Sequence, residues 1–227
     1  MNSGISKIIG FFFLFQSSTS YIIVIPLKST EPSFYDSLKA SYNNPHEQKT
    51  SLSRYGYERD DALSNRNQQA YYNKTTKKLL YNVTGTHNLG DWGTNAYLAA
   101  GKINDTNRYK SADKGLKEAK KKYGVDSATV YGHSLGGTIA GYIGSKNDTV
   151  KTLDKGATIG QKVRSNEHAY RTAFDPISLL NANSKHMTTL PNQNKKFMSG
   201  ILPIDGIVNG IKAHNEDSIK GQSNRFI

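Results

Sequence analysis

A serine with a glycine two positions away on each side is the residue in this chain best suited to nucleophilic chemistry. The run Gly132-His133-Ser134-Leu135-Gly136 matches the G-x-S-x-G pattern, in which a serine sits on a sharp strand-to-helix turn with its hydroxyl exposed. Glycines are needed because the residues on either side of the serine pass so close that a side chain would clash, and the serine itself holds a strained backbone. The pattern predicts that Ser134 attacks a carbonyl carbon.

The neighbours of this run decide how it is interpreted, because a bare match is a weak signal in a chain with 20 glycines. Residues 128–131 are apolar and β-branched, which predicts a short buried strand, and residues 135–143 predict a helix directly after the serine. The first free N–H groups of that helix, beginning with Leu135, would face a tetrahedral oxyanion. The alternative is a glycine-rich helix start with an ordinary serine.

Two later residues complete the set that a serine nucleophile needs. Residues 170–174 predict a strand that ends at Asp175, and a carboxylate at the carboxyl end of a parallel strand shares a sheet edge with Ser134. His214 follows, which gives the chain order Ser, Asp, His of an α/β-hydrolase triad. We therefore expect Asp175 to orient His214 and to stabilise its protonated form. The alternatives are a plain Asp-Pro turn and a structural histidine; the weaker histidine candidates are His87, His133 and His186.

A glycine-rich turn after an earlier strand is the candidate for the rest of the site. Residues 79–84 predict a strand, and GTHNLGDWGTN follows it. Thr86 offers a backbone N–H and a hydroxyl, so that Thr86 and Leu135 would together form the oxyanion hole. Leu89 and Trp92 lie in the same loop, where apolar side chains would act as a lid or contact the substrate. The alternatives are an ordinary glycine-rich loop and a core position for Trp92.

The composition allows one domain and excludes several kinds of site. A chain of 227 residues is long enough for one substantial core and short for two. It has no cysteine, which excludes disulfides, thiolate metal sites and a cysteine nucleophile, and its six histidines show no metal-ligand spacing. We expect no catalytic metal and no cofactor. The net charge of +12 suits an anionic membrane surface, and no motif indicates nucleic acid.

The N-terminal stretch is the only strongly apolar part of the chain. Residues 8–15 have the length of a signal-peptide core, and residues 8–27 together could just span a bilayer, although five polar residues interrupt them. We predict a signal peptide or membrane anchor over residues 1–27, and hence a secreted or membrane-associated protein. The alternative is a buried strand.

The rest of the chain divides into a polar stretch and a catalytic domain. Residues 28–66 predict a polar N-terminal extension made of a linker and surface elements, and residues 67–227 predict the domain itself. The composition is polar from residue 28 to residue 78, and four tyrosines indicate that part of this stretch packs on the core: Tyr55, Tyr57, Tyr71 and Tyr72. A helix is predicted over residues 111–123, with Ser111 as its N-cap and Gly124 at its end. A strand is predicted over 157–160 and a polar loop over 181–200. The apolar segment over 201–211 either lines an acyl pocket or packs in the core.

Several of these motifs together resemble the class 3 lipase family, including compact versions encoded by large DNA viruses. The resemblance lies in residues 79–95, the GHSLGG run at 132–137, residues 157–160 and residues 170–176, and it covers residues 67–219. It implies an α/β-hydrolase fold, with a mostly parallel sheet flanked by helices, and a serine esterase acting on acylglycerols or phospholipids.

The resemblance also assigns roles to single residues. It implies Ser134 as nucleophile, Asp175 and His214 as the rest of the triad, and Thr86 and Leu135 as the oxyanion hole. The chain departs from the family pattern at residue 84, where a threonine stands in place of an arginine, and in the segment from the aspartate to the histidine, which is shorter than usual.

The sequence therefore predicts a serine carboxylic-ester hydrolase, similar to a lipase or phospholipase, that forms an acyl-serine intermediate. Its partner would be a lipid or other ester substrate. The alternative from another class is a catalytically inactive hydrolase fold that serves as a membrane-associated or virion structural protein, which the basic charge and the apolar N-terminus also fit. A peptidase or thioesterase would share the triad and differ only in the pocket.

Overall fold

The computed structural model describes residues 31–86, 103–156, 163–173, 175, 177–178, 186–191, 216–222 and 225. These residues build a seven-stranded sheet in which the strand order follows the chain, from β1 at one edge to β7 at the other. The strands are β1 (Glu58–Asn65), β2 (Gln68–Asn73), β3 (Lys78–Val83), β4 (Thr129–His133), β5 (Thr149–Leu153), β6 (Glu167–Thr172) and β7 (Met187–Leu190). The pairs from β1 to β3 are antiparallel and those from β3 to β7 are parallel, so the sheet is mostly parallel.

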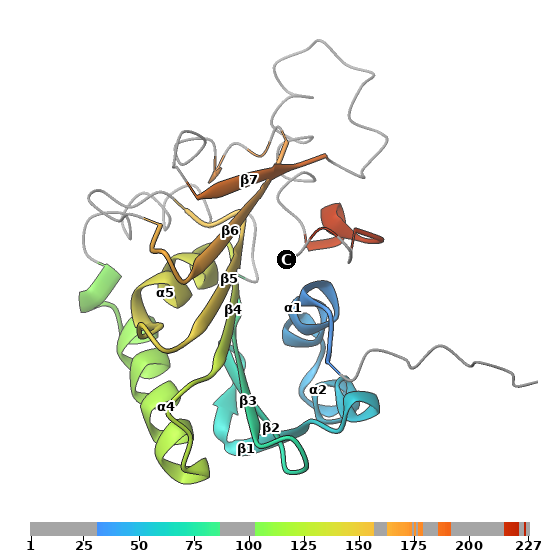
Figure 1. The fold of residues 1–227 in the computed structure, drawn as a ribbon, viewed down its shortest axis with the longest axis vertical. Coiled ribbons are helices and arrows are strands. Elements are labelled where there is room, and N and C mark those ends of the chain that lie inside the picture. The colour runs from blue at the N-terminus through green and yellow to red at the C-terminus, as the bar shows by residue number, and fades with distance from the viewer. Residues whose placement is uncertain are drawn as a thin grey trace, which may run out of the picture.

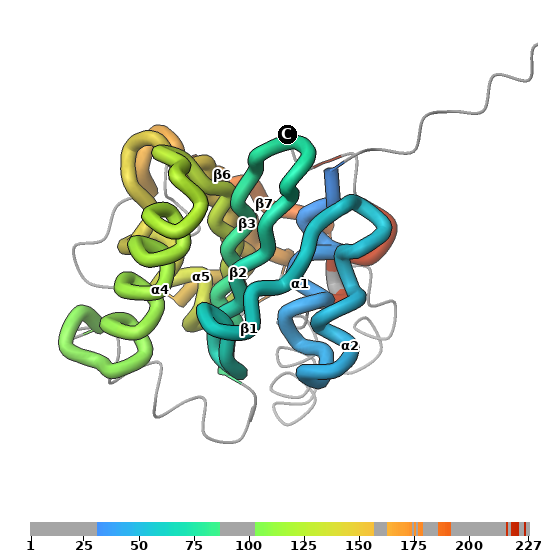
Figure 2. Tube along the Cα trace, turned by 90° about the horizontal axis from the view of Figure 1, so that it is seen from below, coloured from blue at the N-terminus to red at the C-terminus, as the bar shows by residue number. Residues whose placement is uncertain are grey.

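Helices cover both faces of the sheet (Figures 1 and 2). One face carries α4 (Asn107–Tyr123) and α5 (Leu135–Ile143), and the other carries α1 (Phe34–Tyr42) and α2 (Pro45–Thr50). Short 3-10 turns are η1 (Ser53–Tyr55), η3 (Ile103–Asp105) and η6 (Glu216–Ile219), the last of which contacts α1. The architecture is thus an α/β fold with helices on both sides, as the sequence predicts.

The central strands are buried on both faces, and their side chains divide between two cores. In β4, Val130 packs into the core under α4 and α5, whereas Tyr131 packs into the core under α1. The first core also holds Leu116 and Ile139, and the second holds Leu38. Successive side chains of a strand point to opposite faces, so a strand with apolar residues at consecutive positions must lie in the middle of a covered sheet. Strand β4 is accordingly paired on both sides, with β3 and with β5, in the middle of the sheet.

The elements around the serine form where the sequence predicts them. Helix α5 begins at Leu135 and ends at Ile143, and β4 and β3 coincide with the predicted strands to within two residues. Helix α4 ends at Tyr123, and its C-cap Gly124 adopts a left-handed conformation with φ of 62°. Its start differs from the prediction, because Thr106 and not Ser111 is the N-cap and accepts the N–H of Tyr109. One helical turn with little apolar content therefore precedes the amphipathic part.

Three regions differ from the sequence-based expectations. The polar stretch before residue 66 forms α1, α2 and the edge strand β1, and Phe34 and Leu38 of α1 are buried. The sequence pattern does not predict β5. The expected polar loop over residues 181–200 is wrong where it contains β7, whose Thr188 and Thr189 are exposed. An edge strand with polar, exposed side chains has no hydrophobic alternation to reveal it.

Other predicted elements lie outside the described residues: the apolar stretch over residues 1–27, the strand over 157–160, and the segment over 201–211. Within the part of the chain that the structure describes, none of the helices combines the length and the apolar character needed to cross a bilayer.

Candidate active site

Ser134 occupies a strained position between β4 and α5. Its backbone has φ of 58° and ψ of −127°, a combination that residues with a side chain rarely adopt. Its N–H donates to the carbonyl of Leu153 at 3.0 Å, which ties the turn to the end of β5. Ser134 is the N-cap residue of α5, yet its side chain does not cap the helix. The hydroxyl therefore does not make the capping bond that serines usually make at a helix N-terminus.

The glycines on either side of Ser134 are required by close backbone contacts. A Cβ atom on Gly132 would lie 2.4 Å from the carbonyl oxygen of Gly136, and a Cβ atom on Gly136 would lie 2.1 Å from the carbonyl oxygen of Val83. Both distances are far below van der Waals contact and the obstructing atoms belong to the backbone, so no side-chain movement would relieve them. The geometry of a nucleophile elbow is thus present at Ser134.

The turn after β3 lies directly against this elbow. A Cβ atom on Gly85 would lie 3.0 Å from Cβ of Ser134, so the two residues are in contact. Thr84 is fully buried, and its N–H donates to the carbonyl of Asn67 at 2.9 Å. Thr86 comes next and is half-buried, and no hydrogen bond joins it to another described residue. The structure therefore brings Thr86, Ser134 and the first residue of α5, Leu135, to one corner of the sheet.

Tyr42, at the end of α1, connects the turn to the elbow. Its hydroxyl accepts the N–H of Gly85 at 3.1 Å and lies 2.5 Å from Nδ1 of His133. The phenol hydrogen can be donated to Nδ1 when the imidazole is neutral. His133 is buried and is engaged by Tyr42, which makes it a poor base for its neighbour Ser134. No sequence pattern indicates a role for Tyr42, because it lies 91 residues from His133 in the chain.

Asp175 is a fully buried carboxylate just beyond the end of β6. Its Oδ2 accepts the N–H of Ser178 at 2.7 Å and also the hydroxyl of Ser178. Arg171 donates to the backbone carbonyl of Asp175 at 3.5 Å. Strand β6 is separated from β4 by β5, and because the three strands are parallel, their carboxyl ends lie on the same side of the sheet. Asp175 is thus held in a fixed orientation at the edge where Ser134 lies.

A second buried carboxylate, Asp154, stands between these two positions and was missed from the sequence. It follows β5, is fully buried and has φ of 47°. Its carboxylate accepts the N–H and the hydroxyl of Thr172 at 2.6 and 2.7 Å, and it lies 3.3 Å from the hydroxyl oxygen of Ser178, whose single hydrogen is shared with Asp175. Both oxygens of Asp154 therefore brace the end of β6. Because Ser178 contacts both aspartates, Asp154 supports Asp175 indirectly.

Three predicted site residues lie outside the described residues: Leu89, Trp92 and His214. The structure does not place them. Among the residues that it does describe, no three histidine, aspartate or glutamate side chains are grouped as metal ligands.

A groove of about 660 Å³ lies at the opposite edge of the sheet. Three lysines contribute to its lining, Lys77, Lys78 and Lys151, and it runs along the starts of β3, β4 and β5. Neither Ser134 nor Asp175 lines this groove. It is therefore separate from the candidate active site.

Comparison with known proteins adds little to this geometry. No protein-family model matches the chain, and no curated protein sequence matches it. A solved structure that resembles it is that of the Lip2 lipase from Yarrowia lipolytica, with a TM-score of 0.39 and 14% sequence identity over 61% of this chain and 69% of the lipase. A likeness this distant is too weak to carry a functional argument, so the case for function depends on the site itself.

Proposed function

We propose that this chain is a serine hydrolase that cleaves carboxylic esters through an acyl-serine intermediate, with Ser134 as nucleophile. The observation that carries the proposal is the backbone of Ser134, which has φ of 58° in a turn where Gly132 and Gly136 leave no room for side chains. A conformation of this kind costs about 1–3 kcal/mol and persists only where the surroundings enforce it. Strained backbone of this kind is concentrated at functional sites.

Asp175 and His214 are the proposed partners of Ser134. Asp175 is buried and oriented through one carboxylate oxygen, which suits an acid that binds an imidazole and does not itself move. The other described histidines are poor candidates. His133 is engaged by Tyr42, and His168 and His186 lie near the starts of β6 and β7, at the opposite end of the strands. His46 is an exposed residue of α2. The chain order then favours His214.

The reaction follows from these roles. His214 would take the proton of the Ser134 hydroxyl as its oxygen attacks the ester carbonyl, and the N–H groups of Thr86 and Leu135 would stabilise the resulting oxyanion. The protonated imidazole would then give its proton to the departing alcohol. A water molecule, deprotonated by the same histidine, would attack the acyl-serine and release the carboxylic acid. Each oxyanion donor contributes about 3 kcal/mol to lowering the barrier in sites of this type.

The proposed substrate class is an acylglycerol or phospholipid ester, by the resemblance to class 3 lipases. Leu89 and Trp92 are proposed to contact the acyl chain or cover it. A peptidase or thioesterase would use the same triad, so the substrate class is tested separately, with a panel of lipid esters, amides and thioesters.

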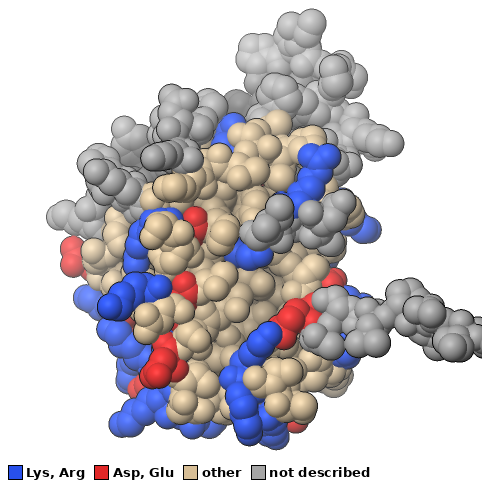
Figure 3. Space-filling view, in the orientation of Figure 1, with Lys and Arg blue, Asp and Glu red and all other residues tan. Residues whose placement is uncertain are grey.

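The basic surface does not contribute to this proposal. Lysine and arginine side chains are numerous over α4 (Figure 3), where five lysines are exposed: Lys110, Lys114, Lys117, Lys121 and Lys122. Three of these pair with carboxylates of Glu118, Asp113 and Asp60. The lysine-rich last turn of α4 leads into the start of β4, which is the edge opposite Ser134. A membrane bound to that turn would not face the site.

The test is covalent labelling with a fluorophosphonate, followed by hydrolysis of a short-chain p-nitrophenyl ester. We expect the wild-type protein to be labelled once, at Ser134, and Ser134→Ala to lose both labelling and turnover. Ser127→Ala is the matched control, because Ser127 is an exposed serine at the opposite edge. His214→Ala should also abolish labelling. A wild-type protein that does not react would indicate the inactive hydrolase fold instead.

A further inference from the structure

Arg108 binds the turn that precedes Thr86, although its buried position disfavours the charge of the guanidinium. Its guanidinium donates to the carbonyl of Thr84 and, at 3.4 Å, to the carbonyl of Gly85. Burial lowers the pKa of this guanidinium, and its Nε is buried without a hydrogen-bond partner among the described residues. Arg108 also lies in the first turn of α4, where the helix dipole disfavours a positive charge. The stability of α4 therefore does not explain why an arginine stands here.

The carbonyl of Gly85 and the N–H of Thr86 belong to the same peptide group. Because a peptide group is planar and trans, its N–H points opposite to its C=O. A guanidinium that holds the Gly85 carbonyl therefore also sets the direction of the Thr86 N–H. The other backbone groups nearby are occupied: the Thr84 N–H binds Asn67, and the Gly85 N–H binds Tyr42. Thr86 has the first N–H of the turn with no partner among the described residues.

The turn also has little room to move relative to the elbow. A Cβ atom on Gly136 would lie only 2.1 Å from the carbonyl oxygen of Val83 and 2.6 Å from that of Thr84, so the backbone of the turn packs directly against α5. Gly85, the next residue of the turn, also contacts Ser134. Displacing such a group by about 1 Å is enough to cost a large factor in rate, because catalysis depends on the donor lying at hydrogen-bond distance from the developing charge.

We propose that Arg108 is a positioning residue, which fixes the Gly85–Thr86 peptide group so that the Thr86 N–H is directed at the oxyanion formed on Ser134. The inference rests on the proposed hydrolase function and deepens it, since Arg108 donates to the carbonyls of Thr84 and Gly85 and so acts on the site through the turn. Loss of one oxyanion donor lowers kcat by about 10²–10³-fold in comparable sites. We expect Arg108→Ala to lower kcat by about 100-fold and to change KM by less than about twofold.

Arg164 provides a matched control. Its guanidinium also binds backbone carbonyls, those of Gly141, Tyr142 and Gly144, but at the far end of α5. Both arginines are half-buried. Arg108→Ala and Arg164→Ala should therefore both lower the melting temperature, whereas only Arg108→Ala should lower kcat. Arg108→Lys, which can reach one carbonyl but not hold two in a fixed geometry, should fall between wild type and Arg108→Ala.

Chemical rescue separates positioning from general stability. Guanidinium chloride at about 50 mM, far below the molar concentrations that unfold proteins, should restore part of the kcat of Arg108→Ala and none of that of Arg164→Ala. If Arg108→Ala does not fold, the Arg108→Lys variant carries the test, with an expected fall in kcat of about 10-fold at constant KM.

The outcomes distinguish this inference from the function on which it rests. A wild-type protein that does not react with the fluorophosphonate overturns both. A reactive wild type, together with equal kcat values for the two alanine variants or with no rescue by guanidinium, overturns the role of Arg108 alone.

Discussion

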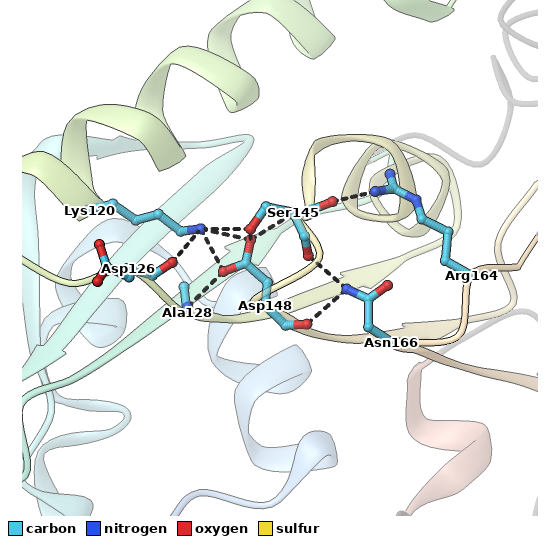
Figure 4. A network of polar contacts seen from close by, with 8 residues as sticks. Lys120, Asp126, Ala128, Ser145, Asp148, Arg164 and Asn166 are labelled. Atoms are coloured by element: carbon cyan, nitrogen blue, oxygen red, sulfur yellow. Dashed lines mark hydrogen bonds and ion pairs between the residues drawn. The ribbon is translucent and has the colours of Figure 1, made fainter.

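The two ends of helix α5 are built in opposite ways. At its C-terminal end, the buried carboxylate of Asp148 accepts the N–H groups of Ala128 and Ser145, both at 2.7 Å, and forms an ion pair with Lys120 at 2.6 Å (Figure 4). Asn166 adds two further bonds to this network, to the carbonyls of Ser145 and Asp148. At the N-terminal end, Ser134 has a strained backbone and its side chain does not cap the helix.

The difference indicates what each end is for. Around Asp148, a buried charge is balanced by a cation and by several donors, which is the arrangement expected of a group that stabilises the fold. Around Ser134, the backbone keeps a strained conformation and close contacts with Gly85 and with the glycines of the turn, and the side chain does not cap the helix. Strain of this kind concentrates at functional sites, where the rest of the fold compensates for it. We therefore expect substitutions at the two ends to affect different properties.

The largest expected effect is on catalysis, at the Ser134 end. Asp175→Asn keeps an oxygen that can accept the N–H of Ser178 but removes the charge that stabilises a protonated histidine. We expect kcat to fall by about 10⁴-fold, as in other triads that lose this charge, with little change in melting temperature. Steady-state hydrolysis and thermal unfolding measure the two quantities. A fall in stability with unchanged kcat would show that Asp175 is only structural.

The next largest effect is on stability, at the Asp148 end. Asp148→Ala leaves Lys120 without its partner and two N–H groups unpaired in a buried site. Removing one member of a buried ion pair costs about 3–5 kcal/mol. We expect the free energy of unfolding in urea to fall by that amount, while kcat of the folded fraction stays within about twofold of wild type. Asp126→Ala is the control, because only the carbonyl of Asp126 contacts Lys120.

A smaller effect is expected at Tyr42, where one substitution should lower both the stability and kcat. Tyr42→Phe removes the acceptor of the Gly85 N–H and the partner of His133, so a part-buried donor loses its bond. An unsatisfied donor costs about 1–3 kcal/mol. We expect a loss of stability in that range together with a fall in kcat of about 10-fold, because the turn that carries Thr86 is loosened. Unchanged kcat would show that Arg108 and the packing against Gly136 hold the turn without Tyr42.

The sequence predicts the Ser134 end well and the Asp148 end hardly at all, for a physical reason. The elbow is local: a strand, a turn with two required glycines and a helix occupy consecutive residues, so the pattern is visible in the chain. The contacts of Tyr42, Arg108 and Asp154 join residues that are 18 to 91 positions apart, and no local sequence pattern predicts contacts over such separations. Strand β5 is not predicted for a different, local reason: Lys151 and two threonines break its apolar pattern.

The smallest expected effect is a gain in stability at Ser134 itself. Ser134→Gly relieves the strain of φ 58°, which glycine adopts freely, although the glycine also makes the unfolded chain more flexible. Relief of the strain is worth about 1–3 kcal/mol, and the greater flexibility of the unfolded chain costs about 0.5–1 kcal/mol. We therefore expect a net stabilisation of about 1 kcal/mol, with complete loss of turnover.

Ser134→Ala separates strain from chemistry, because alanine keeps a Cβ atom and therefore the strain, yet lacks the hydroxyl. It should be as inactive as the glycine variant but no more stable than wild type in urea unfolding. At the other end of α5, Ser145→Gly removes a hydroxyl that donates to Asp148 and should destabilise the protein. If Ser134→Gly also destabilised it, the strained serine would be contributing to the fold, and the contrast between the two ends of the helix would fail.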